Sequence, residues 1–314
     1  MSVLVTGGAG FIGFHTVRHL VEDGYHVVVI DKVPSKIFSS LDKHDGKIDI
    51  IRCDIIKNLR YLREIVREAN YIIHLAAIVN VVEVEEKPIY AFKNNVLGVH
   101  VIANLANKYE VNKIIFASSA AVYGEPCYIP IDENHPVNPK NLYGLTKVLG
   151  ELILRWYSDN YGLKYTILRY FNVYGPRMKL SGYANVIAIF ISNALRNLNL
   201  TIYGDGNQTR DFIFVDDVAV ANVLALKSKR EGIYNVGTGK ETRIIDLARA
   251  ILKLTESRSK IVFKEPRPVD VRRSVANISR IKKDLGWQPK YSLEEGLKET
   301  ILWFRKVLVT NQRY

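Results

Sequence analysis

The feature that most constrains the fold of this chain is a glycine-rich turn close to its N-terminus. Residues 3–5 form a short apolar run, typical of a buried parallel strand. Gly7, Gly10 and Gly13 follow at three-residue spacing, and residues 11–21 carry apolar side chains with helical periodicity. This order predicts a strand, a tight turn and a helix whose N-terminus offers free N–H groups. Such a turn can bind the pyrophosphate of a dinucleotide.

A second apolar run ends in an acidic residue at a distance that fits the same interpretation. Residues 26–30 read as a strand, and Asp31 follows directly. A carboxylate at this place accepts hydrogen bonds from the adenosine ribose hydroxyls and repels a 2′-phosphate, which favours NAD over NADP. Lys32 stands beside it, where it can either contact the cofactor and soften this preference or be solvated.

Strand-like and helix-like segments alternate along the first half of the chain. The strand-like runs are residues 3–5, 26–30, 48–52, 71–75, 113–117 and 165–171. This alternation predicts an α/β fold of the Rossmann type, a doubly wound parallel sheet with helices on both faces. The rhythm loosens after about residue 176, where helical patterns recur at residues 183–197, 242–256 and 293–308. We therefore expect a dinucleotide-binding domain at 1–175, with returning segments from about 210–240, and a smaller, mainly substrate-binding lobe at 176–314.

Composition excludes several other classes of function. The 314 residues carry a formal net charge of +12, but no basic run is interleaved with aromatic residues, so no nucleic-acid partner is expected. The two cysteines, Cys53 and Cys127, and the scattered histidines lack metal-ligand spacing, so no metal is expected. The glycine turn begins at residue 7 and no apolar run has membrane length, which predicts a cytoplasmic protein without a signal peptide or membrane partner.

Three residues point to proton transfer at an alcohol or ketone. Tyr143 and Lys147 are four residues apart on an expected helix, so they share a face. The phenol of tyrosine has a pKa of about 10, and a nearby ammonium is expected to lower it enough for use as a base. Alone, this spacing also fits two surface residues. Ser119 follows the strand-like run 113–117, where its hydroxyl can serve the same substrate oxygen or merely cap a turn.

The motifs in combination resemble the extended short-chain dehydrogenase/reductase superfamily, in its NAD-dependent nucleotide-sugar epimerase/dehydratase branch. The segments that carry the resemblance are residues 6–13, 54–55, 74–77, 94–96, 118–124, 143–147, 169–177, 209–212, 234–237 and 267–270. They span nearly the whole chain in the order of the family. One position departs from it, because Val269 stands where the family usually has a glycine between Pro268 and Asp270.

The resemblance implies a role for each matching residue. NAD would be bound by Gly7, Gly10, Phe11, Ile12, Gly13, Asp31, Lys32, Asp54, Ile55, Leu75, Ala76, Ala77, Asn95, Tyr143, Lys147 and Tyr170. Ser119, Tyr143 and Lys147 would form the catalytic triad. The nucleotide sugar would be bound by Ser119, Asn172, Asn185, Val186, Tyr203, Arg210, Arg267 and Asp270.

The residues after Ser119 limit the reaction. A 4,6-dehydratase or decarboxylase of this family would carry acidic residues there, whereas this chain has Ala120 and Ala121. Methyl groups transfer no protons, which leaves 4-epimerisation through a transient 4-keto sugar, with UDP-glucose and UDP-galactose as the expected pair. Small Ser274, at the position that gates N-acetyl groups in similar epimerases, keeps UDP-N-acetylhexosamines open, and UDP-glucuronate is a further alternative.

Two other classes of function and one assembly remain to be compared with this hypothesis. A nucleotide-sugar 4-reductase would exchange its cofactor, and an NAD-binding regulator would have no need of Tyr143 or Lys147. A homodimer is expected through helices near residues 89–109 and 144–161. The side chains that would face a partner, or else pack on the sheet, are Tyr90, Val99, Ile102, Leu149, Leu152 and Ile153.

Overall fold

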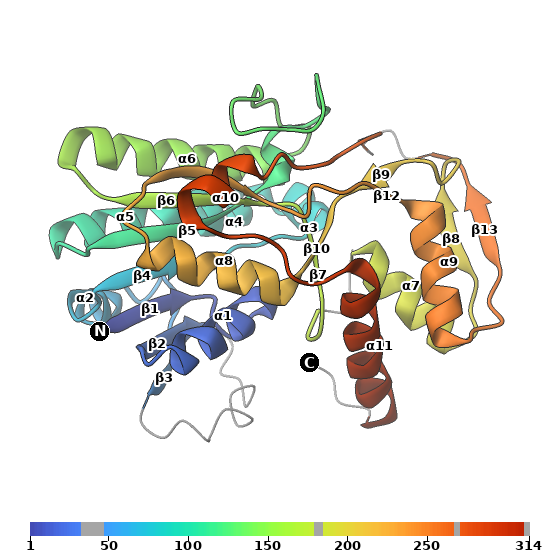
Figure 1. Ribbon diagram of the computed structural model, residues 1–314. Helices are drawn as coiled ribbons and strands as arrows, with labels where there is room; N and C mark the ends of the chain where they lie inside the picture. The colour runs from blue at the N-terminus through green and yellow to red at the C-terminus, as the bar shows by residue number, and fades with distance from the viewer. Residues whose placement is uncertain (33–46, 179–184, 267–270, 311–314) are drawn as a thin grey trace.

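The computed structural model describes residues 1–32, 47–178, 185–266 and 271–310, and its centre is a parallel β-sheet (Figure 1). Seven strands of this described part form the sheet in the order β11-β6-β5-β4-β1-β2-β3. They are β1 (Ser2–Thr6), β2 (His26–Asp31), β3 (Ile48–Arg52), β4 (Tyr71–His74), β5 (Lys113–Ser119), β6 (Tyr165–Tyr170) and β11 (Gly232–Val236). The expected Rossmann-type α/β class is thereby confirmed.

The strand order creates a crevice at the carboxyl ends of β1 and β4. From β1 the chain proceeds outward to β2 and β3, whereas β4, β5 and β6 extend the sheet in the other direction. Thr6 lies in register with Ile30 of β2 and with His74 of β4, so the loops that follow these strands leave the sheet at one level. Ligands of doubly wound sheets bind at such a reversal of strand order.

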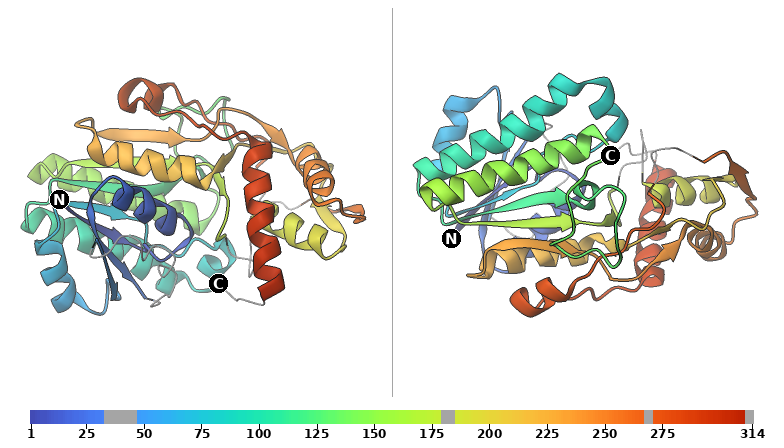
Figure 2. Two further views of the ribbon diagram at one scale, coloured as in Figure 1. Left: turned by 60° about the horizontal axis from the view of Figure 1, so that its bottom comes forward. Right: turned by 90° about the horizontal axis from the view of Figure 1, so that it is seen from above.

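Helices cover both faces of the sheet, as the two views of Figure 2 show. Helices α1 (Phe11–Glu22) and α8 (Val215–Lys227) pack on one face together with Val3 and Val5. Helices α2 (Leu59–Arg67), α5 (Gly98–Lys108) and α6 (Leu142–Tyr161) pack on the other face, where Leu4 is buried. Successive side chains of β1 thus enter different cores, which explains why residues 3–5 are all apolar.

Strand β11 was missed in the sequence analysis, which listed six strand-like runs. It follows α8, pairs in parallel with β6, and buries the polar Asn235 opposite Arg169. Its sequence begins with a glycine and contains this asparagine, which leaves only a short apolar run.

The C-terminal lobe has a core of its own at one end of the sheet (Figure 1). It contains α7 (Val186–Leu195), β8 (Leu200–Tyr203), α9 (Ile244–Thr255), β13 (Ile261–Lys264) and α11 (Leu293–Thr310). Two short ladders join it to the sheet: β7 (Asn172–Tyr174) pairs with β10 (Phe212–Phe214), and β9 (Thr209–Arg210) with β12 (Thr242–Arg243). The remaining helices are α3 (Val81–Glu86), α4 (Pro88–Phe92), a π-helical turn (Lys93–Leu97), a 3-10 turn (Ala120–Val122) and α10 (Ser279–Leu285).

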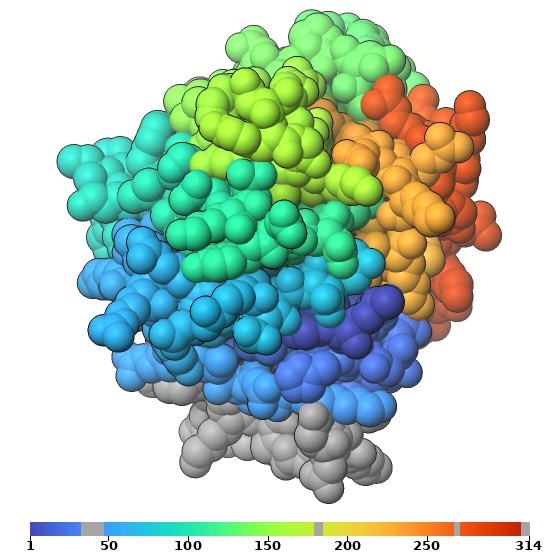
Figure 3. Space-filling model, turned by 90° about the vertical axis from the view of Figure 1, so that its left-hand side faces the viewer, coloured from blue at the N-terminus to red at the C-terminus, as the bar shows by residue number. Residues whose placement is uncertain are grey.

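Figure 3 shows the opposite end of the molecule, near the amino ends of the strands, where successive segments of the sheet domain lie in bands. Among the described helices, none combines the length and the apolar character that a membrane-spanning helix needs.

Candidate active site

The glycine turn between β1 and α1 is built for close backbone approach. Gly7 has a φ of +68°, and a Cβ there would lie 2.8 Å from backbone atoms of Ala76. A Cβ at Gly13 would lie 2.4 Å from the carbonyl oxygen of Gly7. Helix α1 starts after Gly10, which offers no side-chain cap to the first N–H groups. The turn therefore leaves an uncapped helix N-terminus beside bare backbone, which suits a pyrophosphate.

The end of β2 brings acidic and basic side chains together. Asp31 is the last residue of β2, and its carbonyl accepts a hydrogen bond from the N–H of Cys53 at 2.9 Å. The ammonium of Lys32 is bound to the side-chain oxygen of Asn94 and lies 3.5 Å from a carboxylate oxygen of Asp54. Lys32 is therefore engaged within the protein rather than simply solvated.

Asp54 is held as a carboxylate by its surroundings. Burial opposes ionisation, but the N–H of Ile56 at 2.9 Å and the ammonium of Lys32 outweigh it and keep the pKa of Asp54 below its usual value. Ile55 is buried, and its side chain meets α5 at Gly98, so this side chain belongs to the core beside the expected adenine position.

The loop after β4 is linked by hydrogen bonds to both the sheet and α6. The N–H of Leu75 donates to the carbonyl of Thr6 at 3.0 Å, and the N–H of Ala76 to its hydroxyl at 3.3 Å. Asn95, on the π-helical turn, binds both backbone groups of Ile78, just beyond Ala77, at 2.8 and 2.9 Å. Its amide also donates to the hydroxyl of Thr146 in α6 at 3.1 Å. Asn95 thus links the loop after β4 to α6.

Local structure places Tyr143 beside Ser119. Asn141 caps α6 by accepting a hydrogen bond from the N–H of Gly144 at 2.8 Å. A Cβ at Gly144 would lie 2.6 Å from the carbonyl oxygen of Ala121, so glycine lets α6 begin directly against the turn after β5. As a result, the hydroxyl of Ser119 is near enough to that of Tyr143 to favour a lower pKa of the phenol.

Lys147 lies one helical turn further along, as the spacing predicts. Its ammonium is 5.8 Å from the centre of the Tyr143 ring and donates to the carbonyl of Ala117 at 2.8 Å. The expectation of a lowered tyrosine pKa is wrong for the protein by itself. Burial raises the pKa of Tyr143 to about 12, against the smaller effect of the nearby Ser119 hydroxyl. Burial also lowers the pKa of Lys147 to about 8, although Glu151 opposes this shift.

Three further residues assigned to the cofactor make structural contacts as well. Phe11 packs against the core of the lobe, and Ile12 against the core that α1 and α8 share. The hydroxyl of Tyr170, at the end of β6, donates to the side chain of Asn222 in α8 at 2.6 Å.

The described residues predicted to bind the nucleotide lie on β7, at the start of α7 and at the ends of β8 and β9. Asn172 donates to the carbonyl of Asp211 through its backbone and its side chain, at 3.0 and 3.1 Å. Asn185 caps α7 and donates to the carbonyl of Val173 at 3.0 Å, and α7 begins with Val186.

Tyr203 is the last residue of β8, and Arg210 is the last residue of β9. The carbonyl of Tyr203 accepts a hydrogen bond from Gln208 at 2.7 Å. The guanidinium of Arg210 donates to the carbonyls of Thr209 and Val271 at 2.8 and 2.6 Å. Arg267, Val269 and Asp270 lie outside the described residues.

Asp211 was given no role in the sequence analysis, although it belongs to a motif noted there. It is fully buried and accepts hydrogen bonds from the N–H groups of Thr238, Gly239 and Ala276 and from the hydroxyl of Thr238, at 2.6–3.1 Å. The signal was its place beside Arg210, within residues 209–212. Asp211 thus holds two loops, one with Thr238 and Gly239 and one with Ala276, at the same carboxylate.

The chain matches known proteins over nearly its whole length. The family model described as GDP-mannose 4,6 dehydratase matches residues 4–300. The UDP-N-acetyl-alpha-D-glucosaminuronate decarboxylase of Bacillus cytotoxicus is 38% identical over 319 residues, which cover 97% of this chain and 98% of that protein. The crystal structure of UDP-glucose 4-epimerase from Thermotoga maritima, with UDP-glucose, is 39% identical with a TM-score of 0.92, covering 98% of this chain and 100% of that one.

A second solved structure extends the range of sugars among similar proteins. UDP-N-acetylglucosamine 4-epimerase from Methanobrevibacter ruminantium, in complex with UDP-N-acetylmuramic acid, is 36% identical with a TM-score of 0.91, covering 97% of this chain and 98% of that one. The resemblance seen in the sequence is confirmed: the chain belongs to the GDP-mannose 4,6-dehydratase family, in the nucleotide-sugar epimerase/dehydratase branch of the extended short-chain dehydrogenases/reductases.

Proposed function

We propose that the protein is an NAD-dependent 4-epimerase of a UDP-sugar, with UDP-glucose and UDP-galactose as its preferred pair. The observation that carries this proposal is the arrangement at the carboxyl end of β5. There Ser119, Tyr143 and Lys147 come together, and the adjoining turn presents only the methyl groups of Ala120 and Ala121. The site is equipped for oxidation and reduction of an alcohol but offers no acid or base from this turn for elimination.

The described residues fit NAD. The turn at Gly7 and Gly13 leaves bare backbone in front of the uncapped N-terminus of α1. Asp31 ends the neighbouring strand at the level expected for the adenosine ribose, and its carboxylate disfavours a 2′-phosphate. When bound, NAD would accept hydride from C4 of the sugar and return it to the opposite face of the ring.

The protein's own groups would move the proton. Tyr143 would take the proton of the 4-hydroxyl as hydride leaves C4, and would give it back when the 4-keto sugar is reduced. Ser119, which lies near the Tyr143 hydroxyl, would hold the same substrate oxygen. Lys147 would bind the nicotinamide ribose and favour the phenolate form of Tyr143.

The boundary between sheet and lobe would hold the nucleotide. Asn172, Asn185, Val186 and the first turn of α7 would face the diphosphate, since a helix N-terminus favours anions. Arg210, whose guanidinium is held by two carbonyls, would supply the positive charge, and Tyr203 would lie beside the nucleoside. Arg267 and Asp270 are proposed for the second phosphate contact and the ribose, as the family resemblance implies.

A larger sugar is the second candidate. Ser274 is small and partly exposed, at the position that gates N-acetyl groups in similar epimerases. The similarity to the UDP-N-acetylglucosamine 4-epimerase of Methanobrevibacter ruminantium supports the same extension. Turnover of UDP-N-acetylglucosamine tests it, and complete lack of turnover while UDP-galactose is converted would refute it.

The decisive experiment is incubation of the purified protein with UDP-galactose in the absence of added reductant. The expected result is UDP-glucose, approached to the same equilibrium from both directions and measured by chromatography. Tyr143→Phe should abolish it while leaving NAD bound. No conversion of UDP-galactose despite bound NAD would refute this sugar pair and direct the search to acetylated or uronic sugars.

Two competing functions would give different outcomes with the same purified protein. A nucleotide-sugar 4-reductase would consume added NADH in stoichiometric amounts and lose its oxidised cofactor on gel filtration. A regulator that only binds NAD would show binding that is unaffected by Tyr143→Phe and no turnover of any nucleotide sugar.

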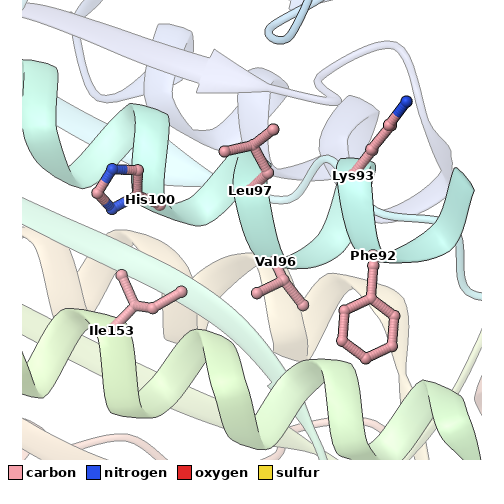
Figure 4. Close-up of a pocket in the computed structure, with 6 residues that line it drawn as sticks. All are labelled: Phe92, Lys93, Val96, Leu97, His100 and Ile153. Carbon is pink, nitrogen blue, oxygen red and sulfur yellow. The ribbon is translucent and has the colours of Figure 1, made fainter. Parts of the chain in front are cut away.

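We also propose that two copies of the chain associate through α4, the π-helical turn and α6. Large apolar side chains are exposed along these elements, among them Ile89, Tyr90, Leu97, Leu152 and Trp156. Between them lies a hollow of about 320 Å³, lined by Phe92, Lys93, Val96, Leu97, His100 and Ile153 (Figure 4). The hollow is apolar and lies on the outer side of these helices, where a second copy would cover it.

Two residues expected at this interface belong to the chain's own core. Val99 and Ile102 are buried against the sheet in the monomer.

Leu152→Glu should convert a dimer, measured by analytical ultracentrifugation, to a monomer. Leu302→Glu is the matched control, because Leu302 is exposed to a similar extent (51% against 52%) on α11. A wild-type monomer at micromolar concentration would refute the dimer.

A further inference from the structure

A buried ion pair lies directly beneath the proposed catalytic groups and takes no part in the mechanism described so far. Glu151 of α6 accepts two hydrogen bonds from Arg169 of β6, at 2.9 and 2.6 Å, and one from the hydroxyl of Ser118, at 2.5 Å. All three residues are at most 7% exposed. Ser118 and Arg169 are partners in the β5–β6 register, so the sheet itself aims both at the carboxylate.

This cluster is coupled to Lys147 by geometry. Glu151 follows Lys147 by four residues in α6, so both side chains lie on one face of the helix. The ammonium of Lys147 is bound to the carbonyl of Ala117, the residue before Ser118. Two consecutive residues of β5 therefore hold the lysine and the glutamate, and Lys147 is buried between them and the Tyr143 ring.

In this arrangement one proton can reside either on Tyr143 or on Lys147. A tyrosine and a lysine that share one removable proton can exist as phenolate with ammonium or as phenol with amine, and the two forms carry the same total charge. Burial raises the pKa of Tyr143 to about 12 and lowers that of Lys147 to about 8, so burial alone favours loss of the proton from Lys147. Only the phenolate form provides a base for the 4-hydroxyl.

We propose that Glu151 is a positioning residue that holds the shared proton on Lys147 and thereby makes Tyr143 the base. Its carboxylate stabilises the ammonium form of Lys147 and has no such effect on the neutral amine. Arg169 and Ser118 fix the carboxylate in place through three charge-assisted hydrogen bonds. This inference rests on the proposed use of Tyr143 as the base.

A stabilising role alone gives a weaker explanation of the ion pair. Buried ion pairs often contribute no more to stability than an apolar pair of similar volume would. A second link extends from the same guanidinium, which donates to the hydroxyl of Tyr123 at 3.0 Å, and Tyr123 donates to Asn235 of β11 at 2.6 Å. Arg169 is thus anchored on both sides, and the carboxylate that it holds is kept at a constant distance from Lys147.

The test measures ionisation of Tyr143 without any sugar. Tyrosinate absorbance of the NAD-loaded protein is titrated, and the same titration in a Tyr143→Phe background is subtracted, because the chain has 18 tyrosines. In Glu151→Gln, the phenolate signal of Tyr143 should fall about tenfold at a given pH for each pKa unit that Lys147 loses. In turnover assays kcat should fall to the same extent, with the KM for the sugar unchanged.

Two further variants keep the result interpretable. Glu151→Leu combined with Arg169→Met removes both buried charges and leaves neither unpaired, so it should remain folded and still lose the phenolate signal. Asp159→Asn removes an exposed carboxylate from the same helix and should leave the signal unchanged.

An unchanged Tyr143 signal in either folded Glu151 variant would overturn the inference. So would absence of any Tyr143 signal in the wild-type protein, since there would then be no phenolate to select. Neither outcome depends on which sugar is turned over, so a failure of the proposed epimerase activity is distinguished from a failure of this inference.

Discussion

Two regions each bury a carboxylate but provide it with different hydrogen-bond partners. One is the catalytic edge, by which we mean the carboxyl end of β5 with the proposed catalytic residues Ser119, Tyr143 and Lys147. The other is the lobe boundary around Asp211. At the catalytic edge, Glu151 is paired with the full positive charge of Arg169. At the lobe boundary, Asp211 accepts hydrogen bonds from neutral groups alone among the contacts described, and burial raises its pKa despite these bonds.

The difference corresponds to what each region does. A charged pair beside Lys147 can influence which groups are ionised, and so acts on the chemistry. The neutral donors around Asp211 come from two loops, at residues 238–239 and at Ala276, so that carboxylate acts on the shape of the lobe boundary. The comparison predicts that changes at the catalytic edge act on kcat, whereas changes at the lobe boundary act on stability and substrate binding.

The largest effect is expected from Tyr143→Phe at the catalytic edge. Loss of the acid–base group should lower kcat by about 10²–10⁴-fold, because general acid–base catalysis contributes a factor of this size. The melting temperature and the amount of bound NAD should change little, since the ring remains. Steady-state kinetics measure kcat, and calorimetry measures the melting temperature. A kcat within threefold of the wild type corresponds to a change in activation free energy of only about 0.7 kcal/mol, and would show that another group is the base.

Asp211→Asn should show the opposite pattern at the lobe boundary. An amide in place of the carboxylate turns a donor toward buried N–H groups, which should cost about 3 kcal/mol in the free energy of unfolding. The KM for the nucleotide sugar should rise, because Arg210 and Asn172 adjoin this residue. Thr238→Val, which removes one donor, is a milder control. A fall in kcat without loss of stability or rise in KM would contradict the assignment of Asp211 to stability and substrate binding.

The sheet and the proximity of Tyr143 and Lys147 were predictable because they depend on local patterns. The strands listed in the sequence analysis are rich in apolar residues, and Tyr143 and Lys147 share a face through helical spacing alone. The carboxyl-edge position of Ser119 follows from the strand before it. For these residues, neighbours in the sequence carry the information.

The rest depended on partners that lie far apart in the chain. Glu151 meets Arg169 only because α6 packs on the sheet beside β6, and Asp211 meets Ala276 across 65 residues. The direction of the Tyr143 pKa was mispredicted for a related reason. Spacing places a lysine near the phenol, but the burial that dominates both pKa values arises from packing of the whole site.

Gly13→Ala should have a smaller effect, confined to the cofactor end of the crevice. A methyl group would lie 2.4 Å from the carbonyl oxygen of Gly7, and the overpacking should cost about 2 kcal/mol of stability. NAD retention on gel filtration should fall as the turn moves. Gly10→Ala is the matched control, because a Cβ there meets only that same oxygen, at 3.0 Å. Equal losses in the two variants would show that steric fit does not shape this turn.

The smallest effect is expected at Asp216, which sharpens the contrast between charged and neutral partners. Burial opposes its ionisation, but hydrogen bonds from His15 and His19 and the charge of Arg18 keep the pKa of Asp216 well below its usual value. A carboxylate with a lowered pKa stabilises the protein above the unfolded pKa of about 3.9 and loses this contribution as the pH falls. Asp211, with its raised pKa, contributes in the opposite sense.

Asp216→Asn should therefore flatten the acid branch of the stability curve. Between about pH 6 and pH 3, chemical denaturation should show the wild type losing about 1 kcal/mol more than the variant, because the variant has no carboxylate to protonate. Asp23→Asn is a suitable control, since Asp23 forms an exposed pair with Lys227 at the far end of the same helices and should change the slope less. If the two variants have the same acid branch as the wild type, charged partners do not set the pH dependence of stability. The distinction between the charged catalytic edge and the neutral lobe boundary would then apply to the chemistry alone.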